Sequence, residues 1–472
     1  MPRTRTVATP QLEILLDGIQ PTFHPGDAIT GRIIRGAPVV SSRAWLTIQL
    51  IGRSKTKIVI SRGQAGTSIY RGRYSFFHPS ETQTRLFDGP IHVPEGASQE
   101  WAFTLSVPTA MDPSAVAAGN QQRASYLSLS RQDIPGHPLP PVFYTSGVSR
   151  VLAMKSYEGF VEYFLTAELH VEPASGQTAV HAAHLPINVV APPTPELLVE
   201  AHNLKRRSFL CRLSTHRLAA EGGESASLSL QQRAQEMFRS SHVPQFAFSL
   251  QVEHPTVLPI GNPEPIPFRL LVLPDRDQTT AAIRDSPQTV VLTAMTFEIR
   301  ACTHMVCPAA WSTRSAEQGR KFDFGVKAAL EARAAGEEPV VVPSGEKAEA
   351  LDVGALLDLS MANAPLVRRV FSNKRVPLSP TFTTYNVKHT HRLRWELKLT
   401  VAGESTEVSS EVDVTLVPGS AGGELPPYEE FEDGEGPDMD APPPPLEDDE
   451  REMEKGDKGE KGNKLGMPTK DN

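Results

Sequence analysis

The stretch that decides the fold class is residues 12–34, which read LEILLDGIQPTFHPGDAITGRII. Two short segments rich in apolar residues, Leu12–Leu16 and Ala28–Ile34, flank a Pro-Gly-Asp sequence at 25–27. Alternation of apolar and polar residues predicts half-buried strands, and Pro-Gly-Asp is typical of a tight turn. Short strands and turns of this kind continue to about Val190, which predicts an antiparallel sandwich or barrel.

Composition argues against several other classes of protein. The 472 residues include 42 prolines, which fit poorly inside helices because the ring removes a hydrogen-bond donor and clashes with the preceding turn. No apolar run reaches the roughly 18–20 residues that span a bilayer, and the first residues lack the apolar segment of a secretion signal. The three cysteines, Cys211, Cys302 and Cys307, are too few for a disulfide framework. We therefore expect an intracellular, soluble protein that is not all-helical.

The net charge of −8 is distributed unevenly along the chain. Residues 424–450 contain twelve acidic side chains and no Lys or Arg, so the preceding residues are mildly basic. The basic residues of that preceding part are scattered rather than gathered in a stripe, which argues against a nucleic-acid partner. From residue 419 onward the sequence combines few apolar residues with a high density of like charge, and this combination predicts disorder.

The strand pattern occurs in two successive units of similar size. The first unit is predicted at 10–192 and the second at 242–418, with an acidic and proline-rich tail at 419–472. Between the units, prolines at 193 and 195 break the strand pattern, Lys205–Arg207 is basic and Gly222-Gly223 is flexible, so we expect residues 193–241 to form an interdomain linker. Within that linker, the apolar spacing over 230–238 predicts one short amphipathic helix.

Several segments resemble the arrestin-like proteins of fungi. Phe23–Gly31 is similar to the opening strands of an arrestin N-terminal domain, with an aromatic residue, Pro-Gly-Asp, an apolar residue and Gly in that order. Later segments in matching order are Leu86–Pro90, Leu139–Phe143, Val161–Leu165, Pro265–Arg269 and Thr384–Val387. The resemblance implies two tandem immunoglobulin-like antiparallel β-sandwiches, the arrestin fold. We identify no counterpart of the buried charge cluster by which other arrestins sense a phosphorylated receptor, so that mechanism is not implied.

The motif that carries the predicted function is Leu425-Pro426-Pro427-Tyr428, at the head of the acidic tail. Two prolines fix φ at about −65°, so the segment is a polyproline II helix before it binds and loses little entropy on docking. Tyr428 projects from the same edge of this helix as Leu425, toward an aromatic-lined groove such as that of a WW domain. The alternative interpretation is a proline-rich linker that binds nothing. The resemblance implies a Leu-Pro-x-Tyr ligand for a WW-domain HECT-type ubiquitin ligase.

The resemblance also implies a role in membrane traffic. It predicts an adaptor that binds cytosolic segments of membrane transporters or receptors while the ligase ubiquitinates them and so promotes endocytosis. Such an adaptor is expected in the cytoplasm, with recruitment to the plasma membrane or endosomes. Lys205, Arg206 and Arg207 are a candidate patch for acidic lipid or a phosphorylated cargo tail, or else a solubilising linker patch. The alternative is a retromer- or coat-like sorting scaffold of the same fold that recruits no ligase.

Motifs for catalysis or metal binding do not occur in the sequence. We find no Gly-x-Ser-x-Gly elbow, Walker-type loop, Gly-x-Gly-x-x-Gly turn or His-Glu-x-x-His, and we expect no enzyme activity, cofactor or metal. His389 and His391 alternate on a predicted strand and could share a metal, but no Cys or acidic residue converges on them in the sequence. Cys302 and Cys307 are interpreted as free buried thiols. A hydrolase or metalloenzyme on a β-sandwich is the remaining hypothesis from a different class.

Overall fold

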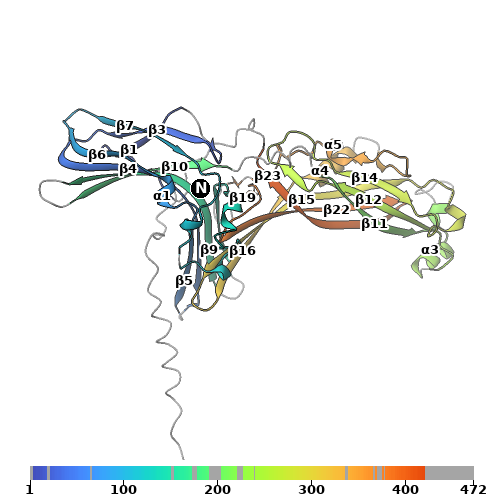
Figure 1. Ribbon diagram of the computed structural model, residues 1–472. Coiled ribbons are helices and arrows are strands. Elements are labelled where there is room, and N and C mark those ends of the chain that lie inside the picture. The colour runs from blue at the N-terminus through green and yellow to red at the C-terminus, as the bar shows by residue number, and fades with distance from the viewer. Residues whose placement is uncertain are drawn as a thin grey trace, which may run out of the picture.

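The chain is built mainly from β-strands, with a few short helices (Figure 1). This computed structural model describes residues 4–419 except 19–21, 64–65, 118, 150–153, 173–177, 191–202, 220–226, 239, 335–338, 365–366, 369–374 and 377. The predicted all-β fold class is confirmed. In the part of the chain so described, no helix has the length and apolar character needed to cross a bilayer.

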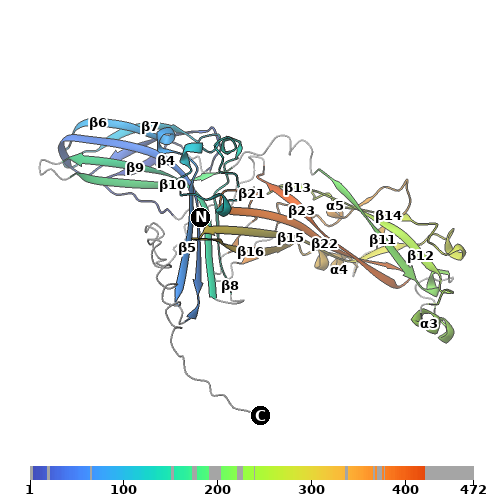
Figure 2. The ribbon, with the colours of Figure 1, turned by 60° about the horizontal axis from the view of Figure 1, so that its bottom comes forward.

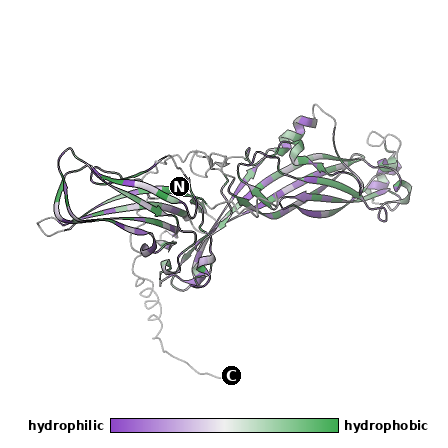
Figure 3. Cartoon of the chain, turned by 45° about the horizontal axis from the view of Figure 1, so that its top comes forward, coloured by the Kyte–Doolittle hydropathy of each residue, from purple (hydrophilic) through white to green (hydrophobic). Residues whose placement is uncertain are grey.

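The first half of the chain forms two sheets that share one core. Its elements are β1 (Glu13–Leu16), β2 (Thr22–Phe23), β3 (Ala28–Arg35), β4 (Val39–Ser61), β5 (Thr67–Ser75), α1 (Pro79–Thr82), β6 (Gln83–Val93), β7 (Gln99–Ser106), β8 (Phe143–Ser149), β9 (Met154–Glu172) and β10 (Ala179–Val189). One sheet has the order β1-β3-β7 and the other β2-β10-β9-β4-β5, with β6 paired to β4 and β8 to β9. Hydrophobic and hydrophilic residues alternate along these strands (Figure 3), and in β3 every second residue is buried. The buried residues of both sheets belong to one cluster.

The second half is also built from two sheets around a core. Its elements are β11 (Lys205–Ser214), α3 (Leu230–Met237), β12 (Gln245–His254), β13 (Val257–Pro259), β14 (Arg269–Pro274), β15 (Val290–Pro308), β16 (Thr313–Asp323), α4 (Val326–Ala334), β17 (Val340–Val342), β18 (Leu351–Asp352), α5 (Val353–Leu356), β19 (Val367–Arg368), β20 (Arg375–Val376), β21 (Phe382–Thr383), β22 (Val387–Val401) and β23 (Glu404–Val417). One sheet has the order β11-β12-β14-β18 and the other β13-β23-β22-β15-β16. The core contains Trp395 and Phe297, both fully buried.

The two halves repeat one strand topology. In the first half, β1 pairs with β3, β3 with β7, and the short β2 lies parallel to the last strand, β10. In the second half, β12 pairs with β14, β14 with β18, and the short β13 lies parallel to the last strand, β23. The long strand β4 pairs with β5, β6 and β9, as β15 pairs with β16, β17 and β22. Strand β11 lies outside this repeat.

The second sandwich begins earlier in the chain than the sequence pattern indicates. Strand β11 pairs with β12 over its whole length, from Lys205 opposite His254 to Ser214 opposite Gln245. The prediction that 193–241 is an interdomain linker is therefore wrong for the residues of β11. The helix predicted at 230–238 is present as α3, but its apolar residues are exposed: Leu230, Met237 and Phe238.

The two sandwiches meet where their longest strands run beyond the separate cores. Figure 2 shows the outer parts of β5 and β8 beside β15 and β16, and β5 contacts β15 directly. Met305 and Cys307 of β15 belong to the same buried cluster as the core of the first sandwich. Tyr385, which is fully buried, stacks on Tyr74 of β5 with ring centroids 4.9 Å apart. An apolar core is thus continuous across the contact between the halves.

Candidate functional site

The basic run identified in the sequence lies on an edge strand. Lys205, Arg206 and Arg207 are the first three residues of β11, and all three are exposed. One side of β11 pairs with β12, and among the described residues no strand pairs with its other side. An unpaired edge presents backbone N–H and C=O groups on which another chain can form a further strand. The structure therefore places these basic residues on an edge strand that contacts β23 of the other sheet, and not in a linker.

Two of the three basic side chains have partners within the second sandwich. Arg206 Nη2 lies 2.5 Å from Glu253 Oε1 on β12. Arg207 Nη1 donates to Ser410 Oγ on β23 at 2.9 Å, which joins the edges of the two sheets. Because the Arg206 side chain is exposed, its ion pair is solvated and contributes at most about 1 kcal/mol. An incoming carboxylate can therefore compete for Arg206 at little energetic cost.

The outer face of β11 carries both basic and apolar side chains. Successive residues of a strand point to opposite faces, and Cys211 and Leu213 are buried in the core. Arg206, Leu210 and Arg212 therefore lie on the outer face. Leu210 exposes 53% of its surface, although it lies in the middle of the strand. A complementary strand would carry acidic residues beside the arginines and an apolar residue beside Leu210.

A neutral polar cluster lies between the two sandwiches. The Thr56 hydroxyl on β4 donates to the carbonyl of Val306 on β15 at 2.8 Å and accepts from Asn386 Nδ2 at 3.1 Å. The Cys307 thiol donates to the same hydroxyl at 3.3 Å. Thr56, Asn386 and Cys307 are all fully buried, and a buried polar group left without a partner costs about 1–3 kcal/mol. These bonds therefore favour one relative position of the two sandwiches.

A buried ion pair lies within the first sandwich. Arg53 Nε on β4 is 2.6 Å from Glu162 Oε1 on β9, and both side chains are almost completely buried. The backbone N–H of Thr4 donates to Glu162 Oε2 at 2.8 Å, so the pair also holds the first described residues of the chain. These three residues all belong to the first half, and they are not the interdomain charge cluster sought in the sequence.

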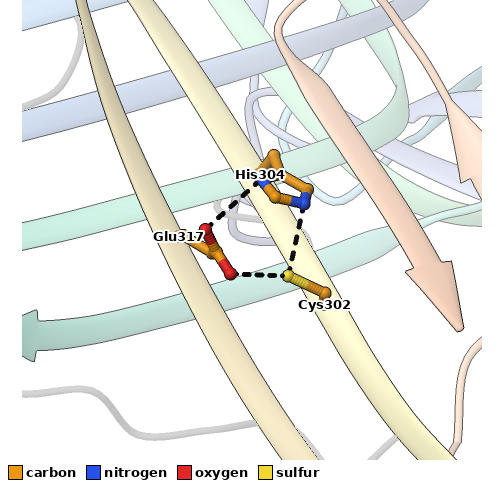
Figure 4. A group of neighbouring side chains, drawn as sticks. All are labelled: Cys302, His304 and Glu317. Carbon is orange, nitrogen blue, oxygen red and sulfur yellow. Dashed lines mark hydrogen bonds and ion pairs between the residues drawn. The ribbon is translucent and has the colours of Figure 1, made fainter. Parts of the chain in front are cut away.

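A third polar group lies on β15 and β16 and was not identified from the sequence. Cys302 Sγ donates to Glu317 Oε1 at 3.1 Å and lies 3.3 Å from His304 Nε2 (Figure 4). Burial raises the pKa of the Cys302 thiol to about 12, with a further contribution from its hydrogen bond to Glu317. A thiol with so high a pKa is protonated at neutral pH and is a poor nucleophile, so the cluster does not support a cysteine-hydrolase function.

The prediction that Cys302 and Cys307 are both free buried thiols is correct for Cys307 but not for the burial of Cys302. Both thiols are free, and Cys307 is buried, but Cys302 is only partly buried. An odd spacing of five residues along β15 places the two side chains on opposite faces of the strand. The partners of Cys302 are instead His304, two residues along the same face, and Glu317 on the neighbouring strand. The Cys-x-His spacing was visible in the sequence, whereas the register of the hairpin was not.

His389 and His391 are buried within β22 and have separate hydrogen-bond partners. His389 Nδ1 lies 2.8 Å from Thr303 Oγ1, and His391 Nδ1 lies 2.8 Å from Thr381 Oγ1. Burial lowers the pKa of His391 to about 3 and holds the pKa of His389 well below its ordinary value. Both imidazoles are therefore neutral, and each uses its Nδ1 in a bond to a hydroxyl rather than facing a shared metal.

The proline–tyrosine motif, Leu425, Pro426, Pro427 and Tyr428, lies outside the described residues, and the second sandwich ends with Val417 of β23 shortly before it. No protein-family model matches the chain, and no curated protein sequence matches it. A function is therefore inferred from the residues of this chain and from their geometry.

Proposed function

We propose that the chain is an arrestin-related adaptor, which binds cytosolic segments of membrane transporters or receptors and recruits a WW-domain HECT-type ubiquitin ligase. The observation that carries this proposal is the basic edge strand β11, whose outer side has no paired strand among the described residues. An extended acidic segment of cargo would add to this edge as a further strand. Main-chain hydrogen bonds would supply affinity, and Arg206 and Arg212 would select acidic side chains. Interaction surfaces of this kind suit a binding protein and require no catalytic residue.

Recruitment of the ligase is assigned to Leu425–Tyr428. Two consecutive prolines favour the polyproline II conformation, and a segment of that kind followed by a tyrosine would fit the groove of a WW domain. The contact area of four residues is small, so binding through the motif alone would be weak. Cargo held on the same chain raises the local concentration of ligase around its lysines, and tethering of this kind increases occupancy without new contacts. The covalent chemistry belongs to the ligase.

The contact between the two sandwiches favours a rigid scaffold that carries both the cargo-binding strand β11 and the ligase-binding motif. Thr56, Asn386 and Cys307 form buried hydrogen bonds across it, and the surrounding core is continuous. A fixed scaffold keeps the β11 edge and the end of β23 within one body. The tail that follows β23 would then present the ligase at a limited range of distances from bound cargo.

A titration of the full chain with a panel of isolated WW domains tests the proposed recruitment of the ligase. We expect saturable binding by the unmodified chain and loss of that binding in Tyr428→Ala. Phe431→Ala is the matched control, since it removes a nearby aromatic ring from the same tail and should leave binding intact. Flat titrations for the unmodified chain would contradict ligase recruitment and favour the retromer- or coat-like scaffold.

Reversal of charge on β11 tests the proposed binding of cargo. Labelled extended peptides with alternating acidic and β-branched residues serve as the probe. The double variant Arg206→Glu and Arg212→Glu should weaken their binding by roughly tenfold or more, because two attractive contacts become repulsive. The control for net charge is Arg284→Glu combined with Lys347→Glu, which makes the same change of charge at two exposed positions elsewhere on the second sandwich. Equal affinities for the double variant and the control would exclude the β11 edge as the cargo site.

A further inference from the structure

Cys302, His304 and Glu317 direct their donor atoms toward one another on the β15–β16 hairpin (Figure 4). Cys302 and His304 are two residues apart on β15 and therefore share a face of the sheet. The strand register places Glu317 of β16 directly opposite His304. The ligating atoms that these side chains offer all lie within 4.8 Å of one another. Three different metal-binding groups thus converge without any change of backbone.

The distances between the donor atoms are close to those of a tetrahedral zinc site. Zinc bonds of about 2.3 Å to sulfur and about 2.0–2.1 Å to nitrogen or oxygen place two tetrahedral ligands about 3.3–3.6 Å apart. Cys302 Sγ lies 3.3 Å from His304 Nε2 and 3.1 Å from Glu317 Oε1. His304 Nδ1 lies 3.8 Å from Glu317 Oε2, which orients the imidazole with Nε2 toward the sulfur. Small rotations of exposed side chains would complete the geometry.

The surroundings leave room for an ion and a solvent ligand. Gly319 lies opposite Cys302 on β16, and a Cβ at that position would meet no atom within 4 Å. The side chains of His304 and Glu317 are 39% and 65% exposed, so an ion can reach the site from solvent. Three protein ligands with one position left for water are typical of an accessible zinc site rather than of a closed structural one.

The charge of the site is compatible with its basic neighbours. Lys388 on β22 lies opposite His304, and Arg392 on the same strand is a neighbour of Cys302. A zinc ion bound by one thiolate and one carboxylate has no net charge, so these cations do not repel the complete site. Arg392 is in addition paired with Glu411 and Asp413. A thiolate–imidazole donor set favours zinc over calcium or magnesium, which prefer oxygen ligands alone.

We infer that Cys302, His304 and Glu317 form a binding site for Zn²⁺, with Cys302 Sγ, His304 Nε2 and Glu317 Oε1 as ligands and water in the fourth position. The bound ion would cross-link β15 to β16 on the outer face of the sheet. This inference is independent of the proposed adaptor function, because none of the three residues belongs to the β11 edge or to the tail.

Metal titration of the untagged full chain tests the inference. The chain is first treated with a chelator and then titrated with Co²⁺, whose thiolate complexes absorb through sulfur-to-metal charge transfer, and afterwards with Zn²⁺ in competition. We expect one thiolate-bound Co²⁺ per chain, displaced by Zn²⁺ and unaffected by excess Mg²⁺. Cys302→Ser should abolish the charge-transfer absorption. Glu317→Gln, at an exposed position that does not affect the core, should retain the absorption and weaken affinity roughly tenfold or more.

Matched controls separate this site from the other thiols. Cys307→Ser changes a thiol on the opposite face of the same strand, and Cys211→Ser changes the buried thiol of β11; both should leave the absorption unchanged. Absence of thiolate-to-cobalt absorption in the unmodified chain would overturn the inference. So would absorption that survives in Cys302→Ser, since the metal would then be bound by another cysteine.

Discussion

Glu162→Gln tests how much the first sandwich depends on its buried ion pair. Glu162 is fully buried, and its Oε1 lies 2.6 Å from Arg53 Nε. Glutamine keeps the shape of the side chain but removes its charge, which leaves the buried guanidinium of Arg53 without this carboxylate. Loss of one partner of a buried pair costs about 3–5 kcal/mol. Arg53 keeps a contact over the Phe164 ring at 4.8 Å and a hydrogen bond to Thr4 Oγ1. We therefore expect the substitution to lower the free energy of unfolding by about 3 kcal/mol, the lower end of this range.

Equilibrium urea denaturation of the full chain, followed by circular dichroism, measures this change in the free energy of unfolding. The double variant Arg53→Met and Glu162→Leu is the informative comparison. It removes both charges and keeps most of the volume, so it should recover much of the lost stability. A cost below about 1 kcal/mol for Glu162→Gln, or a double variant no more stable than the single one, would refute the assignment of the loss to an uncompensated buried charge.

Two other perturbations test the contact between the sandwiches and the histidines of β22. Gly72→Val should lower stability by about 1–3 kcal/mol, because a Cβ at Gly72 would lie 2.6 Å from Thr56 Oγ1. Gly319→Val is the control and should not lower stability, because a Cβ at that position meets no atom within 4 Å. Melting temperatures measured by calorimetry compare the two variants. Acidification from pH 6.5 to pH 5 should destabilise the protein, because the unfolded state protonates His389 and His391 while the folded state, whose pKa values are lowered, does not. The loss approaches about 1.4 kcal/mol per histidine per pH unit well below pH 6.5 and becomes small above about pH 7.5. His391→Phe should reduce the pH slope of the unfolding free energy measured by urea denaturation.

Strands that face one core were predictable because their burial alternates. In β3 the apolar residues Ile29 and Ile33 are buried while Thr30 and Arg32 are exposed, so the sequence pattern and the burial pattern coincide there. The pattern is weaker in β16, whose buried residues include Ala316 and Gln318. These residues pack in the contact between the sandwiches, where a small side chain and an amide bonded to Thr145 are needed. A strand that packs against another sandwich therefore lacks the apolar repeat that marks a strand packed on its own core.

The polar sites were less predictable because each depends on register between distant segments. Cys302 and His304 are recognisable as neighbours from their spacing alone. Glu317 joins them only through the pairing of β15 with β16, which a turn of one residue more or less would shift. Thr56 and Asn386 come from opposite halves of the chain, and their bond follows from the way the two sandwiches meet. No local pattern encodes a contact of that kind.

The repeated topology helps to separate stability from function in this chain. Features that any such sandwich needs occur in both halves, among them the long central strand and the short strand that lies parallel to the last one. Among the residues that the structure describes, the first half has no strand that corresponds to β11, and β11 brings a basic and partly apolar surface to a sheet edge. An element that only one copy of a repeated architecture carries is not explained by the requirements of that architecture. The difference between the two halves therefore favours β11 as the element with a binding role.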